Sequence, residues 1–195
     1  MKHLIILFFL FSCWRITSSQ EIENYKLYSD SVTIIFNDSD SVDFADYFND
    51  QSKIDSISKC YNNWHKRALA IEGYQINRLK PDIVIENNNR IAKLANGNII
   101  ILKPDADLDE VEYTFEKSLL NGKLLIFRVQ WFEGNNYFIF NTIDGTKTYT
   151  FGRVYISPNR DFLVSINDDI VAGYSSNGLE LFSINNDFNI KKIWE

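Results

Sequence analysis

Turn signals built from Asn, Asp and Gly recur through residues 113–184 and divide this stretch into short runs of β-branched, aromatic and Leu residues. Asn-Gly and Asp-Gly tolerate the positive φ angles of the tight turns that join antiparallel strands. Their spacing of roughly 8 to 12 residues leaves no room for the crossovers that parallel strands need. The sequence therefore predicts an antiparallel meander. The signals are Asn121-Gly122, Gly134-Asn135-Asn136, Asp144-Gly145 and Asn177-Gly178, of which the first and last are expected to be two-residue turns.

Further strands are expected before this stretch. Residues 32–36 form a β-branched run, and extended structure should restart at residues 81–85. A turn is expected over residues 87–89. Residues 91–94 and 99–102 should then pair as a hairpin over Asn96-Gly97.

One stretch, residues 51–71, has the periodicity of an amphipathic helix. Its apolar residues recur at spacings of three and four, which places them on one face. Asp50 or Ser52 should cap its start, and Gly73 should end it. The apolar stripe consists of Ile54, Ile57, Cys60, Trp64 and Ala68. Cys60 is therefore expected to be a small buried hydrophobe, and His65 an ordinary helix-surface histidine.

Together these elements predict a mainly β fold. At 195 residues the chain is long enough to bury one core. We expect a single domain over residues 20–195, in which a meander occupies about residues 83–195 and one N-terminal amphipathic helix covers a face or an edge of it.

The first 19 residues have the pattern of an export signal. Lys2 precedes an uncharged apolar run, and the small residues Thr17, Ser18 and Ser19 follow it. The run is shorter than the roughly 20 residues of a transmembrane helix. A second interpretation stays open, because residues 10–13 resemble a loose bacterial lipobox in which Cys13 would be the acylated residue. Cleavage near Ser19 is favoured, and it predicts a periplasmic or secreted protein with no membrane-spanning segment.

Charge and cysteine content exclude some classes of function. The formal net charge of −6 argues against a nucleic-acid partner held by phosphate contacts. Once Cys13 is removed or acylated, Cys60 is the one remaining thiol, so no intramolecular disulfide can form. The acidic residues Asp105, Asp107 and Asp109 are weak candidates for a metal site. No glycine follows to turn the chain around an ion, so a charged loop is expected, with no metal or cofactor.

The last third of the chain resembles β-propeller blades of the WD40 and TolB types. Residues 154–165, with Ser157-Pro158-Asn159-Arg160-Asp161 at their centre, are similar to the strand, Ser-Pro-Asp-Gly-Lys, strand element of such blades. Residues 177–184 resemble the outer strand that ends a blade, and residues 137–152 resemble the end of the blade before. Arg160 stands where the family has Gly, and no Gly-His or Trp-Asp signature is present. The resemblance implies propeller-blade-like hairpins. At about 40 to 45 residues per blade the chain has room for at most about four, so a closed propeller is not expected.

The sequence contains no recognisable catalytic motif, which favours a binding or structural protein of the bacterial cell envelope over an enzyme. Its partner would be a protein or another envelope component. Trp131, Tyr137 and Tyr155 are candidate aromatic anchors, although about half of such strand residues must face the core. The alternative is an envelope hydrolase that uses carboxylates from the acidic loops at residues 38–50 and 105–112.

Overall fold

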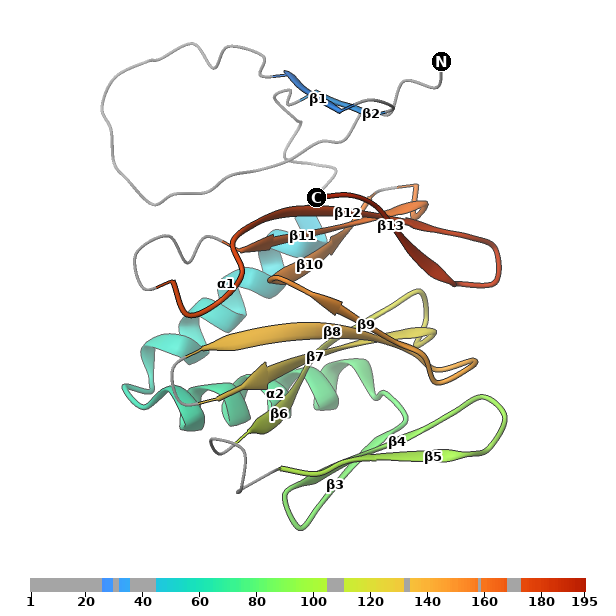
Figure 1. The fold of residues 1–195 in the computed structure, drawn as a ribbon. Coiled ribbons are helices and arrows are strands. Elements are labelled where there is room, and N and C mark those ends of the chain that lie inside the picture. Colours follow the sequence, from blue (N-terminus) through green and yellow to red (C-terminus); the bar gives the residue numbers. More distant parts are fainter. Residues whose placement is uncertain are drawn as a thin grey trace, which may run out of the picture.

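The computed structural model describes residues 26–29, 32–35, 45–104, 111–131, 134–157, 159–167 and 173–195. These residues form a mainly β structure with two helices (Figure 1). Strands β1 (Lys26–Ser29) and β2 (Val32–Ile35) pair as an antiparallel hairpin, which confirms the strand expected near residue 32. Within the described residues, neither helix has the length and apolar character needed to cross a membrane.

The single helix predicted over residues 51–71 is wrong, because the chain forms two helices there. Helix α1 (Ala45–Lys59) and helix α2 (Trp64–Leu79) are separated by a four-residue break. The Asn63 side chain caps α2 by accepting the backbone N–H of Lys66 at 3.0 Å. The local hydrogen bond of this cap competes with continuation of α1. At the other end α2 runs through Gly73, and Lys80 ends it in the left-handed conformation.

The break also changes the environment of the predicted apolar stripe. Cys60 is exposed rather than buried, and its thiol donates to the carbonyl of Ser56 at 3.3 Å. Trp64 is 46% exposed at the first position of α2. Asp50 and Ser52 lie inside α1, so neither begins a helix. The predicted stripe spans the boundary between α1 and α2, so its residues do not form the face of one helix.

The remaining strands form three antiparallel sheets in which every strand pairs with its neighbours in sequence, as predicted for a meander. The three-stranded sheet contains β3 (Ile83–Glu86), β4 (Asn89–Lys93) and β5 (Ile99–Leu102). The central sheet contains β6 (Glu112–Leu119), β7 (Leu124–Gln130), β8 (Asn135–Asn141) and β9 (Lys147–Thr150). The C-terminal sheet contains β10 (Arg153–Ile156), β11 (Phe162–Asn167), β12 (Gly178–Ile184) and β13 (Ile190–Trp194).

The three sheets are stacked with the central sheet in the middle (Figure 1). One face of the central sheet packs on the three-stranded sheet, through side chains such as Phe127 and Phe138 against Leu102. Its other face packs on the C-terminal sheet, through Ile126 and Ile139 against Phe182 among others. Strand β7 is therefore buried on both faces, which explains its continuous apolar run where a one-sided strand would alternate. Within the described residues the sheets close into neither a barrel nor a propeller.

The turns predicted from Asn, Asp and Gly are confirmed at some hairpins, and two of the predicted two-residue turns are wrong. A two-residue turn lies at Asn87-Asn88, whose φ angles are 49° and 63°. Asp144-Gly145 turns the chain between β8 and β9 as expected. Asn121-Gly122 is part of a four-residue turn instead, because Leu119 pairs with Leu124. Asn177-Gly178 is not a tight turn, since Gly178 already pairs with Asn167 and ten residues lie between the two partners, where a two-residue turn has two.

The turn that carries the blade resemblance is held by its own side chains. The Ser157 hydroxyl donates to Asn159 Oδ1 at 2.6 Å and accepts the backbone N–H of Phe162 at 3.1 Å. Arg160 has a φ of 64°, the left-handed conformation that suits the Gly found at this place in the blade motif. Strand β12 lies between β11 and β13, so the expectation that residues 177–184 form an outer strand is wrong.

Replacing Arg160 with Gly should stabilise the protein by about 0.5 to 1 kcal/mol. Glycine removes the steric cost of a left-handed L-residue, which outweighs its greater flexibility in the unfolded chain. The Arg160 side chain is exposed, so little packing is lost. Urea unfolding of the R160G variant measures the gain. Arg160→Val should have the opposite effect, because a β-branched residue is strained at positive φ; equal stability of the two variants would show that this position is not left-handed in solution.

Candidate functional site

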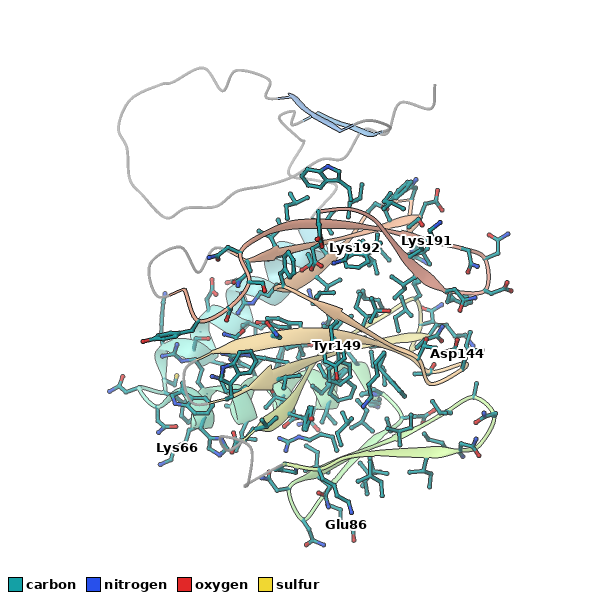
Figure 2. All side chains as sticks on the ribbon, in the orientation of Figure 1. Lys66, Glu86, Asp144, Tyr149, Lys191 and Lys192 are labelled. Carbon is teal, nitrogen blue, oxygen red and sulfur yellow. The ribbon has the colours of Figure 1, made fainter. Side chains whose placement is uncertain are left out.

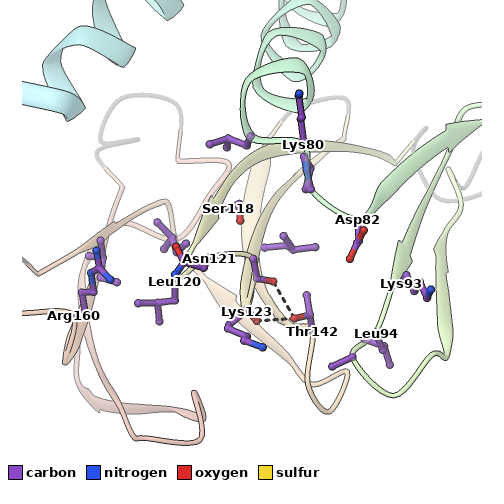
Figure 3. A pocket seen from close by; sticks show the side chains of 17 residues that line it. Lys80, Asp82, Lys93, Leu94, Ser118, Leu120, Asn121, Lys123, Thr142 and Arg160 are labelled. Carbon is purple, nitrogen blue, oxygen red and sulfur yellow. Dashed lines mark hydrogen bonds between the residues drawn. The ribbon is translucent and has the colours of Figure 1, made fainter.

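A cavity of about 780 Å³ lies where the end of α2, the β6–β7 turn and the β10–β11 turn come together (Figure 3). Its walls come from all three sheets and from the helix end. The lining residues are Leu79, Lys80, Pro81, Asp82, Lys93, Leu94, Ala95, Ser118, Leu119, Leu120, Asn121, Gly122, Lys123, Leu125, Thr142, Ile156 and Arg160. Several segments distant in sequence contribute to this cavity, which is typical of a ligand site.

Positive charge dominates the lining of this cavity. Four cationic residues contribute to it, and Asp82 is the one acidic residue among the lining residues. The cations are Lys80, Lys93, Lys123 and Arg160. Figure 3 shows them spaced around the cavity, with Arg160 and Lys93 on opposite sides. Such a concentration of positive charge stands out in a chain whose net charge is −6, and it favours an anionic occupant.

The cavity wall contains four non-glycine residues with left-handed backbone. Lys80, Leu120, Asn121 and Arg160 have φ angles of 46°, 53°, 54° and 64°. Residues in this conformation are uncommon and persist where the surrounding structure holds them. Here the β6–β7 turn is held by Thr142, whose hydroxyl donates to the carbonyls of Gly122 at 3.0 Å and Lys123 at 3.2 Å (Figure 3). The wall therefore has a defined shape.

None of the three predicted aromatic anchors lines the cavity. Tyr137 is 5% exposed and packs in the core between the central and C-terminal sheets. Tyr155 is half-buried, and the Lys117 ammonium group lies 5.2 Å from the centre of its ring. Trp131 is half-buried beside Gly134, where a Cβ atom would lie 2.8 Å from the indole. Tyr137 is thus mainly a core residue, while Trp131 and Tyr155 retain partial exposure.

The buried phenol of Tyr137 interacts with the exposed Arg153 of β10 and the half-buried Glu116 of β6. Burial, and secondarily the negative charge of Glu116, raise the pKa of Tyr137 to about 12. The Arg153 guanidinium hydrogen-bonds the phenol and partly opposes this shift. The carboxylate of Glu116 in turn raises the pKa of Arg153. Glu116 lies at the irregularity of the β6–β7 register, which adds a residue to β6 and brings an acidic side chain to this interface.

The stability of the protein should fall at high pH because of Tyr137. Its folded pKa of about 12 lies above the value of 10 for an unperturbed tyrosine, so the folded state holds the phenol proton more tightly. The contribution is fully present below pH 10 and is lost as the pH rises through 12, in total about 2 to 3 kcal/mol. Unfolding free energies between pH 9 and 12 test this against Tyr137→Phe, which should lose less stability over that range. Parallel curves for the two proteins would contradict it.

His65 has a specific partner, which the sequence did not indicate. Its Nδ1 lies 2.6 Å from the Glu112 carboxylate, and this pair joins α2 to β6. The ring is also 5.7 Å from the Trp64 ring in an edge-on arrangement. The pair is partly exposed, and it links the first turn of α2 to the first residue of β6.

The remaining candidates fall largely outside the described residues. Asp105, Asp107, Asp109 and Cys13 are not among them, nor is most of the two acidic loops of the hydrolase alternative. Within the described residues, no group of three or more His, Cys, Asp or Glu side chains is arranged to hold a metal ion.

Sequence reasoning missed the cavity because its lining residues are scattered along the chain. Two signals pointed toward it. Arg160 departs from the glycine of the blade motif, and Asn121-Gly122 predicts a turn. Neither indicated that both turns face the end of α2. Comparison of the chain with protein-family models, curated proteins and solved structures finds no match.

Proposed function

We propose that this chain is an exported, non-catalytic binding protein of the bacterial cell envelope, and that its cavity receives an anionic group of the partner. The observation that carries the proposal is the ring of Lys80, Lys93, Lys123 and Arg160 around a cavity with one acidic residue. Positive groups at a concave site raise the local concentration of anions and speed their association. Carboxylate or phosphate groups of an envelope component have the matching charge.

Export is supported by the N-terminal sequence, in which Lys2 precedes the apolar run and small residues follow it. Intact mass and N-terminal sequencing of the protein from its native host test this part. A terminus at Gln20 is expected. An acylated Cys13 would instead indicate a lipoprotein, and recovery of the chain still beginning at Met1 would contradict export.

A blade-like arrangement of the meanders is also proposed. Two features support it: three antiparallel meanders stack face to face in sequence order, and Arg160 has the backbone conformation of the motif's glycine. In this arrangement the cavity lies beside the ends of strands from all three sheets. Turns from several meanders can contact one ligand there.

The binding proposal is tested with two anionic probes, inorganic phosphate and a glutamate-rich peptide, by calorimetric titration at low ionic strength. Lys123→Glu and Arg160→Glu should each weaken binding by about tenfold or more, because each places a like charge beside the ligand. Binding should also weaken as salt is added. Lys191→Glu is the matched control, since Lys191 lies on β13, exposed and outside the cavity lining (Figure 2). Equal effects of all three substitutions, or no binding of either probe, would overturn the proposal.

A further inference from the structure

The cavity has an apolar wall in addition to its ring of cations. Eight of the seventeen residues that line it are apolar. Five of them are half-buried, so part of each side chain is left uncovered: Leu79, Pro81, Leu119, Leu120 and Ile156. Charge alone therefore does not describe what this site is suited to bind.

The apolar wall is a continuation of both cores. Leu94 and Leu125 belong to the core between the three-stranded and the central sheet. Leu119, Leu120 and Ile156 pack against the core between the central and the C-terminal sheet. The outermost side chains of the two cores thus meet at the cavity. Apolar surface left open inside a concave site favours an apolar ligand group, because covering this surface removes it from water.

Leu120 stands at a backbone position that suits a different type of residue. Its φ angle of 53° is in the left-handed region, which Asn and Gly adopt readily and a bulky residue seldom does. Such conformations cluster at ligand sites, where the surrounding structure holds them. The Leu120 side chain lines the cavity, and Figure 3 shows it on the same side as Arg160. The β6–β7 turn therefore presents an apolar group next to a cationic one.

The cations of the cavity are available to a ligand. Within the described part of the chain, no salt bridge involves Lys80, Lys93, Lys123 or Arg160, and none involves Asp82. A volume of about 780 Å³ is in the range of sites that bury drug-sized organic molecules. A small inorganic anion would contact part of the ring of cations and leave the apolar wall in water.

We propose that the ligand is an amphipathic anion, an aliphatic chain that ends in a carboxylate or phosphate group. This inference rests on the proposed binding function, because it names the ligand class of the same cavity. The anionic group binds among the cations, and the chain covers the apolar wall. A ligand with many charges and no apolar part, such as an acidic polysaccharide, fits less well because it leaves that wall in contact with water.

Calorimetric titration of the full chain with hexanoate, octanoate and decanoate tests the proposal, at concentrations at which these acids are monomeric. The affinity should rise about two- to fourfold for each added CH₂ group, as expected when such a group leaves water for apolar surroundings. Decyltrimethylammonium has the same chain length with a positive headgroup, so it should bind at least about tenfold more weakly than decanoate.

The outcomes separate this inference from the binding function on which it rests. Equal affinities for the three acids, in a protein that binds phosphate, would overturn the amphipathic ligand and leave anion binding intact. Decyltrimethylammonium binding as tightly as decanoate would overturn both, because the cations would then play no part in recognition.

Two substitutions assign the two parts of the ligand to their walls. Leu120→Asn removes an apolar side chain with a residue that tolerates the left-handed backbone, so it should weaken decanoate binding about threefold or more and leave phosphate binding unchanged. Lys123→Glu should weaken the binding of both. Urea unfolding establishes that each variant is folded. A Leu120→Asn variant that binds decanoate as tightly as the parent, or that loses phosphate binding to the same extent, would contradict the proposed arrangement.

Phosphatidylglycerol vesicles distinguish the two sources of such a ligand. Sedimentation of the protein with these vesicles, abolished by Lys123→Glu and reduced by Leu120→Asn, would identify a membrane lipid as the source. Protein that binds decanoate and stays in the supernatant takes a free acid. Both results support an amphipathic anion, whereas sedimentation that neither substitution reduces, in a protein that does not bind decanoate, would overturn it.

Discussion

Arg90→Met is expected to lower the free energy of unfolding by about 3 to 5 kcal/mol, the cost of leaving a buried carboxylate without its partner. Arg90 on β4 and Glu72 on α2 are each 1% exposed. The guanidinium donates to Glu72 Oε1 at 3.0 Å and to Oε2 at 2.6 Å. Glu72 Oε1 also accepts the backbone N–H of Phe115 at 2.7 Å. One carboxylate thus joins the helix, the three-stranded sheet and the central sheet.

Urea unfolding of the single and double variants separates the loss of a partner from the loss of the pair. The double variant Glu72→Leu, Arg90→Met should recover much of the stability lost in Arg90→Met, because no buried charge then remains. The backbone N–H of Phe115 stays unpaired in it, so recovery should be incomplete. A loss below about 1 kcal/mol in Arg90→Met would show that water reaches this pair in solution.

Gly152→Ala should destabilise the protein by about 3 kcal/mol or more, through a steric clash with backbone. A Cβ atom at Gly152 would lie 2.0 Å from the carbonyl oxygen of Ile166 and 2.9 Å from Cβ of Asn167. The chain crosses here from the central sheet to the C-terminal sheet, and the N–H of Gly152 donates to the Ser165 hydroxyl at 3.0 Å. The strand backbone of β11 cannot move aside without breaking its pairing with β12.

Gly73→Ala is the matched control, because it makes the same chemical change inside α2. A Cβ atom at Gly73 would have no heavy atom of another segment within 4 Å. Alanine is favoured over glycine in a helix by about 0.5 to 1 kcal/mol, so this variant should be more stable than the parent. Thermal unfolding of both variants measures the contrast. Similar melting temperatures would show that the crossing at Gly152 is looser than the structure has it.

Local turn chemistry allowed the meander to be predicted without knowledge of the tertiary structure. Asn87, Asn88 and Gly145 adopt positive φ at little cost, so the hairpins at these positions follow from neighbouring residues alone. The same reasoning failed at Asn121-Gly122 because strand pairing on both sides decides how many residues a loop contains. It failed for the helix because Asn63 caps a second helix inside a stretch whose periodicity looks continuous.

The sequence by itself thus determined the strand content, the antiparallel order and the acidic character of this chain, because these depend on composition and on contacts between near neighbours. The tertiary structure alone decided which charges are buried and where the cavity lies. Nothing in the neighbourhood of Glu72 or Arg90 distinguishes them from surface residues, and Lys80 and Arg160 are eighty positions apart. Burial and convergence are set by how whole sheets and a helix stack, which is a property of contacts between segments distant in sequence.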